Sequence, residues 1–186
     1  QPLVAGEILD AYPFQEHKRL LDVGGGEGRF ICSAGTRYPH LDLMMFDLPA
    51  VAARAEQRIA ENGLGGRAKA FGGNFFTDEL PKGADIVTLV RILHDHDDEK
   101  AQLLLDNIHR ALPHNGRLLI AEPLAETPGA ERMGNAYFGF YLMAMRSGRP
   151  RSRENITAML HRSGFGSVRP IRTRVPLQTS LLVAQR

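Results

Sequence analysis

Apolar residues along the chain occur in short continuous runs that alternate with segments where they recur every three or four positions. The runs read as buried strands and cover 19–23, 41–46, 84–90 and 116–122. The intervening helical spacing predicts helices over 28–38, 49–62 and 98–112. Strands that alternate with helices in this way pair in parallel through crossover helices, so the pattern predicts an α/β doubly wound sheet.

Three weaker runs extend this sheet. They lie near 67–71, 167–173 and 179–184 and bring the expected number of strands to seven. Glycine and proline punctuate the ends of the elements, and no stretch has the composition of an interdomain linker. We therefore expect one domain over 1–186, a Rossmann-like fold with a mostly parallel seven-stranded sheet and helices on both faces.

Composition agrees with a single globular domain. The chain has 186 residues, of which 43% are hydrophobic, enough for one sizeable core. No window approaches the roughly 18 apolar residues that a membrane-spanning helix needs. The single cysteine, Cys32, excludes an internal disulfide and favours a reducing, cytoplasmic location. The chain begins at Gln1 without an initiator methionine, which indicates a part of a longer protein.

Charge is unevenly distributed. The net charge is +2, yet the stretch 146–186 holds nine arginines and a single acid, Glu154. An arginine-rich solvated face is one interpretation of this stretch. The other is peripheral contact with an anionic membrane surface. No nucleic-acid-binding motif accompanies the arginines, so we expect no nucleic-acid partner.

A glycine-rich loop is the first candidate for chemistry. The stretch "LLDVGGGEGRF" places Gly24, Gly26 and two further glycines between a strand and a helix, as a tight turn or a close backbone approach to a ligand requires. Asp47 ends the next strand, and adjacent parallel strands end at one edge roughly 5 Å apart. Asp47 is therefore expected to reach both hydroxyls of a ribose bound over the loop, although a purely structural turn remains the alternative.

The glycine spacing discriminates between nucleoside cofactors. The dinucleotide fingerprint requires Gly-x-Gly-x-x-Gly, whereas this loop has Gly24, Gly26 and Gly28, with Arg29 at the position of the third glycine. Glu27 is unfavourable beside a pyrophosphate but compatible with a cationic sulfonium. An NAD-dependent oxidoreductase is therefore disfavoured.

The stretch "RILHDHDDE" follows the fourth predicted strand. His94 falls at its carboxyl end, where ligands bind in open α/β sheets, and a neutral histidine is a plausible general base. Glu122 ends the neighbouring strand and is expected to orient the imidazole. A structural histidine at a strand end is the alternative. No metal is predicted, because His94 and His96 lack a ligand-spacing pattern; the acids that follow suit a helix start.

Aromatic residues and methionines fill 134–150. A segment that is apolar on nearly every side is either buried core or the lining of a lipophilic pocket. If it lines a pocket, a planar or polyene substrate is favoured over a small polar one. The candidate substrate-binding residues in it are Tyr137, Phe138, Tyr141 and Met145.

The motifs "DVGGGEG" and "FDLP" resemble the cofactor site of class I S-adenosyl-L-methionine (SAM)-dependent methyltransferases, specifically the plant-caffeate-type O-methyltransferase family and its bacterial relatives. The stretch "LHDHDDE" is similar to that family's Leu-His-Asp-Trp motif, whose histidine is the base. The resemblance implies that SAM is held by Gly24, Gly26, Asp47, Leu48, Asn74, Phe75 and Arg91. It further implies His94 as the base, Glu122 as its supporting acid and Asp95 in substrate binding.

Three departures from the family pattern stand out. Asn74 occupies a position where the family usually has Asp, although its amide oxygen can still accept a hydrogen bond from adenine; it could equally cap a turn. His96 replaces the family Trp, and Pro150 stands where a second supporting acid is found in the plant enzymes. The base is therefore expected to be less fully supported than in those enzymes.

Over essentially the whole chain, stretches such as "FDLPAVAARAE", "AEPLAETPGAERMG" and "GNAYFGFYLMAMRSGRPRS" resemble the bacterial branch that methylates hydroxylated carotenoids. This resemblance implies a hydroxyl of an acyclic carotenoid as acceptor and a homodimer formed by the full-length protein through an N-terminal helical region. Alternatives are another lipophilic acceptor (phenolic, quinone-like or tetrapyrrole) and a SAM-binding domain without catalysis.

Overall fold

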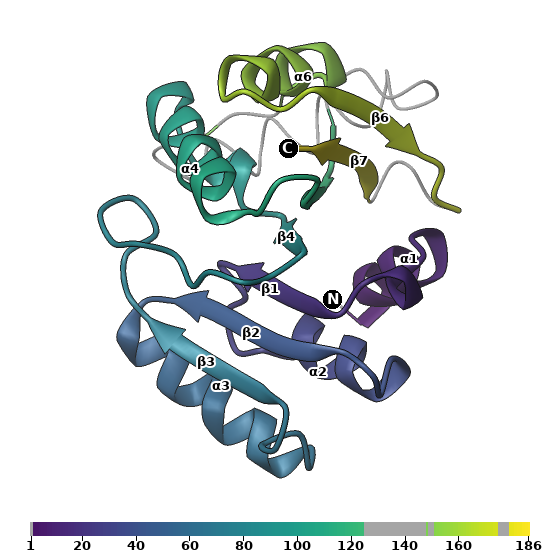
Figure 1. The fold of residues 1–186 in the computed structure, drawn as a ribbon, viewed down its shortest axis with the longest axis vertical. Coiled ribbons are helices and arrows are strands. Elements are labelled where there is room, and N and C mark those ends of the chain that lie inside the picture. Colours follow the sequence, from purple (N-terminus) through teal and green to yellow (C-terminus); the bar gives the residue numbers. More distant parts are fainter. Residues whose placement is uncertain (1, 125–147, 149–150, 175–178) are drawn as a thin grey trace.

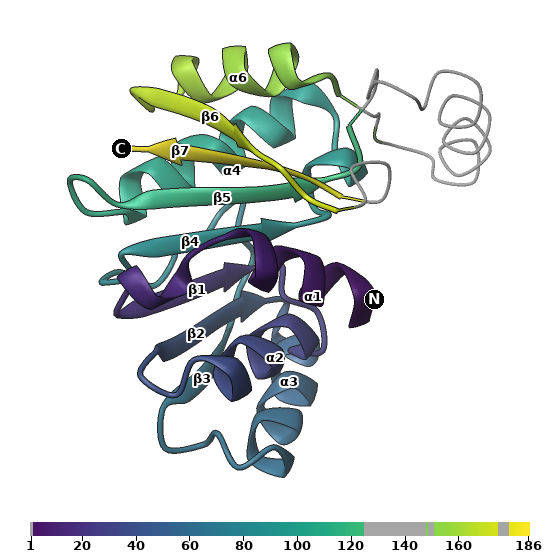
Figure 2. The same ribbon diagram turned by 90° about the vertical axis from the view of Figure 1, so that its right-hand side faces the viewer.

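The structure is a computed structural model that describes residues 2–124, 148, 151–174 and 179–186. Its described strands form one sheet in the order β3-β2-β1-β4-β5-β7-β6 (Figures 1 and 2). The strands are β1 (Arg19–Val23), β2 (Asp42–Asp47), β3 (Ala68–Gly72), β4 (Ile86–Val90), β5 (Arg117–Glu122), β6 (Ser167–Ile171) and β7 (Ser180–Gln185). Each lies within two residues of a predicted strand, so the expected seven-stranded sheet is confirmed.

The described helices precede or follow these strands along the chain. They are α1 (Pro2–Ala11), α2 (Arg29–Arg37), α3 (Pro49–Glu61), α4 (Asp98–Ala111) and α6 (Arg153–Arg162), with short 3-10 turns η1 (Phe14–Glu16) and η2 (Leu93–Asp95). The three predicted helices correspond to α2, α3 and α4. Helices α1 and α6 were not predicted from the sequence.

The pairing pattern brings several strand ends to one edge. Strands β3, β2, β1, β4 and β5 pair in parallel, and β7 pairs antiparallel with both β5 and β6. The mostly parallel arrangement is therefore confirmed. In the parallel part, the carboxyl ends of β1, β2, β4 and β5 meet at the same edge, and the loops that carry candidate site residues follow from it.

Side chains that alternate along the central strands fill two main cores, one on each face of the sheet. Leu20 packs in a cluster with residues of α1 and α2, whereas its neighbour Leu21 packs with residues of α4 and α6. Figures 1 and 2 show α1 and α4 on opposite sides of the sheet. Both faces being covered explains why these strands read as continuous apolar runs rather than as alternating ones.

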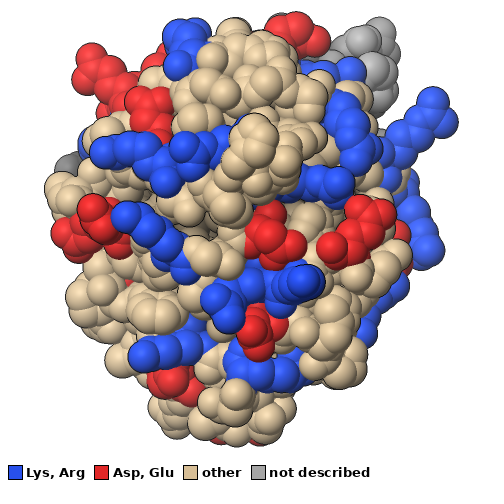
Figure 3. Space-filling model, in the orientation of Figure 1, with Lys and Arg blue, Asp and Glu red and all other residues tan. Residues whose placement is uncertain are grey.

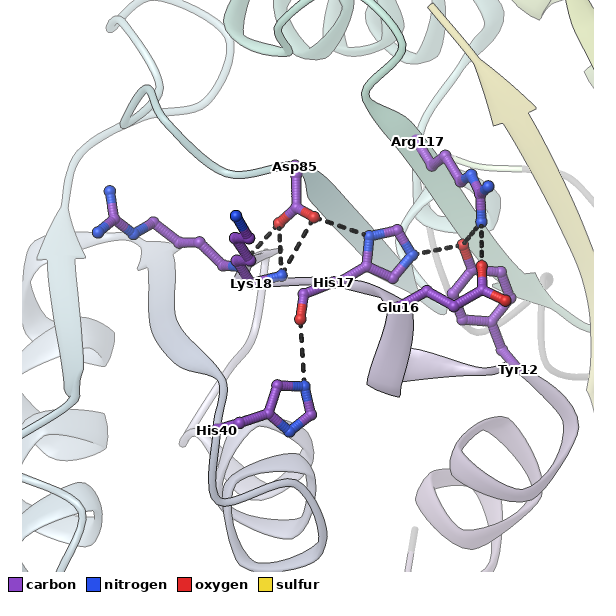
Figure 4. A network of polar contacts seen from close by, with 8 residues as sticks. Tyr12, Glu16, His17, Lys18, His40, Asp85 and Arg117 are labelled. Carbon is purple, nitrogen blue, oxygen red and sulfur yellow. Dashed lines mark hydrogen bonds and ion pairs between the residues drawn. The ribbon is translucent and has the colours of Figure 1, made fainter.

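A polar network fixes the opposite, amino-terminal edge of the sheet (Figure 4). His17 bridges the Tyr12 hydroxyl at 2.8 Å and the Asp85 carboxylate at 3.0 Å. Asp85 also accepts a 2.7 Å hydrogen bond from the backbone N–H of Arg19, and Arg117 donates to the Tyr12 hydroxyl at 3.3 Å. The network ties together the starts of β1, β4 and β5, away from the candidate site.

Among the described residues, the arginines of the C-terminal stretch are not all exposed. Arg151 is buried. Those exposed are Arg153, Arg162, Arg169, Arg172 and Arg174. On the face drawn in Figure 3, basic and acidic side chains are interspersed. Among the described residues, no helix combines the length and apolarity that crossing a bilayer demands.

Candidate active site

An open cavity of about 980 Å³ lies at the carboxyl edge of β1 and β4. Its lining includes the following residues of the glycine loop and the histidine turn and of the strands before them: Asp22, Gly24, Gly26, Arg91, His94 and Asp95. It therefore joins the glycine loop that follows β1 to the histidine turn that follows β4. The sequence predicted that both motifs lie at the carboxyl edge of the sheet, and the parallel pairing of β1 with β4 makes them neighbours.

The glycine loop needs its glycines for two different reasons. Gly24 has φ of 73°, and a Cβ there would lie 2.6 Å from Cδ1 of Ile92. Gly26 has φ of 59°, and a Cβ there would meet no atom within 4 Å, so this backbone faces open space. The first glycine permits tight packing, and the second leaves the loop accessible to a ligand.

Asp47 lies against this loop, at the end of β2. One carboxylate oxygen accepts a 2.8 Å hydrogen bond from the N–H of Gly26, and the other accepts one at 2.7 Å from the N–H of Leu48. The side chain is thereby fixed beside the loop. Each carboxylate oxygen has a second acceptor site, which suits a vicinal diol.

Asp22 is a site residue that the sequence analysis did not identify. It is 1% exposed; its Oδ1 accepts a 2.7 Å hydrogen bond from the Thr88 hydroxyl, and its Oδ2 has no hydrogen-bond partner in the part of the chain that the structure describes. Burial, with a smaller contribution from Asp47, outweighs the Thr88 hydrogen bond and raises the pKa of Asp22 to about 7. The available signal was a carboxylate inside the apolar run "RLLDV".

His94 and Glu122 form a buried pair. His94 is 4% exposed and Glu122 is 2% exposed, and Nδ1 of the imidazole lies 2.6 Å from Oε2 of the carboxylate. The other oxygen, Oε1, accepts a 2.7 Å hydrogen bond from the N–H of Leu93. Glu122, at the end of β5, therefore fixes both the imidazole and the backbone of η2.

The second imidazole nitrogen points toward another acid. Nε2 of His94 lies 3.1 Å from Oδ1 of Asp95, and His94 lines the cavity. Burial lowers the pKa of His94, but the contacts with Asp95 and Glu122 outweigh this effect and raise it to about 9. The imidazole is thus held between two carboxylates that stabilise its protonated form.

The loop after β3 carries Asn74 and Phe75. Oδ1 of Asn74 accepts a 2.9 Å hydrogen bond from the N–H of Phe76, which caps a turn and leaves the second lone pair of the oxygen. The Phe75 and Phe76 rings both contact the His96 ring edge-on, at centroid distances of 5.8 and 5.0 Å. His96 is therefore half-buried against this aromatic pair rather than fully solvated. The adenine-binding role of Asn74 and Phe75 stays a prediction.

Arg91 and Leu48 complete the predicted cofactor set. Arg91 lines the cavity with φ of 59°, a left-handed conformation that is uncommon for a residue with a side chain, and its N–H donates to the Ala121 carbonyl at 2.8 Å. Leu48 is 54% exposed at the start of α3. Neither Leu48 nor Asp47 belongs to the lining of the cavity.

Several predicted positions lie outside the described residues. These are Tyr137, Phe138, Tyr141, Met145 and Pro150. Within the described ranges, no three His, Cys, Asp or Glu side chains gather in a way that would hold a metal ion.

Known proteins match this chain over most of its length. The model of the O-methyltransferase domain matches residues 1–166. Demethylspheroidene O-methyltransferase from Cereibacter sphaeroides is 42% identical over 186 residues, which are all of this chain and 49% of that protein. Aclacinomycin 10-hydroxylase RdmB from Streptomyces purpurascens is 34% identical over 157 residues, covering 84% of this chain and 42% of that protein.

A solved structure agrees with the sequence relatives. The crystal structure of human N-acetylserotonin methyltransferase in complex with SAM superimposes with a TM-score of 0.83 at 25% identity. The match covers 98% of this chain and 51% of that one. This chain thus spans about half the length of the relatives it matches. The family model and the 42% identity over the whole chain lead to one conclusion: the chain belongs to the O-methyltransferase family.

Proposed function

We propose that this chain is the catalytic domain of a SAM-dependent O-methyltransferase. The observation that carries the proposal is the buried His94–Glu122 pair, 2.6 Å apart, beside a cavity that also contains the glycine loop. A base, its orienting acid and a nucleoside-compatible loop at one sheet edge are what methyl transfer to a hydroxyl requires.

The residues present fit the cofactor. Gly24 and Gly26 give the loop the conformation and the open space that a closely bound ligand needs. The Asp47 carboxylate, fixed beside the loop, can accept hydrogen bonds from the ribose hydroxyls. Asp22 offers a buried oxygen with no hydrogen-bond partner among the described residues, suited to an ammonium group. In this proposal, Leu48, Asn74, Phe75 and Arg91 complete the site. The structure of the human relative in complex with SAM supports SAM as the cofactor.

Side chains of this chain accept the proton that the acceptor hydroxyl loses. Bound SAM supplies a methyl group on a sulfonium, which transfers to the acceptor oxygen and leaves a neutral thioether. Nε2 of His94 takes the hydroxyl proton as the oxygen–methyl bond forms, and Glu122 stabilises the resulting imidazolium through Nδ1. Oδ1 of Asp95, 3.1 Å from Nε2, is placed to stabilise the imidazolium once Nε2 carries the proton.

The acceptor we propose is a hydroxyl of an acyclic hydroxylated carotenoid. The name of the Cereibacter relative and its 42% identity over the whole chain support this class. The substrate-binding role of Tyr137, Phe138, Tyr141 and Met145 belongs to the same proposal. A phenolic, quinone-like or tetrapyrrole acceptor is the alternative within the same chemistry.

A second function is SAM binding without methyl transfer. It is favoured by one observation: the RdmB relative is named a hydroxylase, although it is 34% identical to this chain. Membership of the family therefore leaves room for another activity on the same fold. The pairing of His94 with Glu122 favours methyl transfer over this alternative, because a base that is buried and oriented has a use in taking a proton.

At the level of the whole protein, we propose a cytoplasmic homodimer whose acceptor is lipophilic. Peripheral membrane contact through the exposed Arg169, Arg172 and Arg174, in β6 and just beyond it, belongs to this proposal and is supported by their charge. Binding to vesicles should then require anionic lipid, and sedimentation that is equal with neutral and anionic vesicles would contradict the contact.

Turnover tests the proposed activity. The protein at its full natural length is incubated with methyl-labelled SAM and, in parallel, with a hydroxylated acyclic carotenoid, a phenol or no acceptor. We expect label in a methyl ether of the carotenoid, identified by mass spectrometry. Label in the phenol alone would replace the acceptor class, and SAM binding without label in any acceptor would favour the second function.

A further inference from the structure

Arg151 is buried beside the candidate base and contacts both ends of its turn. The residue is 3% exposed and directly precedes Ser152, the N-cap of α6. Its guanidinium donates to the carbonyl of Leu93 at 2.6 Å and to the carbonyl of His96 at 2.7 Å. It also donates to Oδ1 of Asp98 from Nε at 3.0 Å and from Nη2 at 2.9 Å. Because these acceptors flank His94, one side chain spans the whole turn.

The turn depends on such external support. η2 is a three-residue 3-10 turn, and the hydrogen bonds that it makes within itself, such as His96 N–H to Leu93 carbonyl at 3.2 Å, are long. Glu122 secures it from the β5 side through the N–H of Leu93. Arg151 secures it from the α6 side. Removing a guanidinium from water is costly, so its burial here is compensated by charge-assisted hydrogen bonds to this turn.

A glycine three residues earlier contacts the same turn. Gly148 has φ of 115°, and a Cβ there would lie 2.3 Å from the carbonyl oxygen of His94 and 2.9 Å from the carbonyl carbon of Asp95. The backbone at Gly148 therefore packs directly on the peptide that joins the candidate base to Asp95. Two independent contacts from one segment thus converge on one peptide turn.

We propose that Arg151 is a positioning residue for His94 and that Gly148 supports the same turn by packing against the backbone of His94 and Asp95. The guanidinium holds η2 so that the imidazole keeps its bond to Glu122 and presents Nε2 to the cavity. Arg151 touches neither acceptor nor cofactor in this role and acts through the backbone of Leu93 and His96. The catalytic consequence rests on the proposed methyl transfer, whereas the structural consequence for the His94–Glu122 bond does not.

The first test compares Arg151→Ala and Arg151→Lys with Arg153→Ala, an exposed arginine two residues along the chain, in the protein at its full natural length. A misplacement of a base by about 1 Å costs on the order of 100-fold in rate. We expect kcat to fall by 10- to 100-fold (~1.4–2.7 kcal/mol) in Arg151→Ala, with the SAM Kd and the acceptor KM within about threefold of wild type. Lysine is expected to recover little, because one ammonium cannot reach three separated acceptors. The Arg153→Ala control is expected to keep wild-type kcat.

Chemical rescue separates positioning from general destabilisation. Millimolar guanidinium is expected to restore kcat about tenfold in Arg151→Ala, with no effect on Arg153→Ala or on His94→Ala. Loss of kcat that follows the unfolded fraction measured by circular dichroism, without rescue, would overturn the proposal. If Arg151→Ala does not fold, kcat of Arg151→Lys is compared with that of Arg153→Ala. A folded Arg151→Lys protein with wild-type kcat would overturn the positioning role.

A second readout does not depend on activity. The proton shared by Nδ1 of His94 and Glu122 is expected to give a downfield proton NMR resonance that disappears in Glu122→Gln. It should weaken or disappear in Arg151→Ala and persist in Arg153→Ala. An unchanged resonance in a folded Arg151 variant contradicts the positioning role. If the wild-type protein methylates no acceptor while the resonance responds as expected, the proposed function fails and the positioning role stands.

Discussion

Asp95 Oδ1 lies 3.1 Å from Nε2 of His94, on the side of the imidazole that faces the cavity. Glu122 holds the opposite nitrogen at 2.6 Å, so the proposed base lies between two carboxylates. Such a base is strong but is protonated at neutral pH when no acceptor is bound. An acceptor hydroxyl therefore has to reach Nε2 of His94 although Oδ1 of Asp95 already lies beside that nitrogen.

The pH dependence of kcat/KM follows from this arrangement. Because the pKa of His94 is raised to about 9, the neutral imidazole is scarce at pH 7 and its fraction grows as the pH rises toward 9. We expect kcat/KM for the acceptor to rise through this range, since this constant reports the free enzyme. Initial rates from pH 6 to 10 check it. A plateau that begins near pH 6.5 would mean that the imidazole has an ordinary pKa in solution.

Replacement of Glu122 by glutamine should separate orientation from basicity. The variant keeps the size of the side chain but loses the charge that stabilises the imidazolium. A charge-assisted hydrogen bond contributes roughly 1.5–3 kcal/mol, so we expect kcat to fall about 10- to 100-fold. The rise of kcat/KM should also move to lower pH. Glu99→Gln, at an exposed position of α4, is the matched control. Equal rates for the two variants would remove Glu122 from the mechanism.

We expect SAM binding to depend on pH through the ionisation of Asp22. Its pKa is raised to about 7 in the unliganded chain, chiefly by burial, and a bound ammonium group favours the carboxylate. Affinity should therefore increase as the pH rises from 6 to about 7.5, before the amino group of SAM itself loses its proton near pH ~8. Calorimetry in two buffers should detect the proton released. Asp22→Asn should bind more weakly and show no such dependence; a wild-type profile in that variant would exclude an ammonium contact.

His17 should influence stability but not cofactor binding. Burial, opposed by the Asp85 contacts, lowers its pKa below the usual value, so the fold favours the neutral imidazole. The stabilisation is then complete above about pH 6.5 and is lost as the pH falls below it toward the lowered pKa. His17→Gln should reduce the melting temperature at pH 7.5 and flatten its fall between pH 6.5 and 5. The exposed His114→Gln serves as control. Identical melting curves for both variants would contradict this role.

The sequence predicts the sheet and the histidine pair for the same physical reason. Buried parallel strands are continuous apolar runs, and a polar residue that ends such a run must lie at the carboxyl edge. His94 and Glu122 both follow such runs, and β4 and β5 are neighbours, so their proximity was predictable. Asp47 and the glycine loop meet through the adjacent strands β1 and β2 in the same way.

The role of Arg151 depends on tertiary packing, whereas helix α1 has a signal in the sequence. Arg151 is one of nine arginines in its stretch, and only the docking of α6 on α4 brings it to the histidine turn. Within α1 the buried residues Val4, Ala5, Ile8 and Leu9 have the spacing of an amphipathic helix, so this helix could have been predicted from the sequence.

The most direct test of the central claim is the His94→Ala variant, measured for both methyl transfer and SAM affinity in the protein at its full natural length. General base catalysis contributes on the order of 10²- to 10⁴-fold, so turnover of the hydroxylated carotenoid should fall by at least about 100-fold. The SAM Kd should stay nearly unchanged. Turnover that persists at the wild-type rate, or a joint loss of turnover and SAM binding, would contradict His94 as the base.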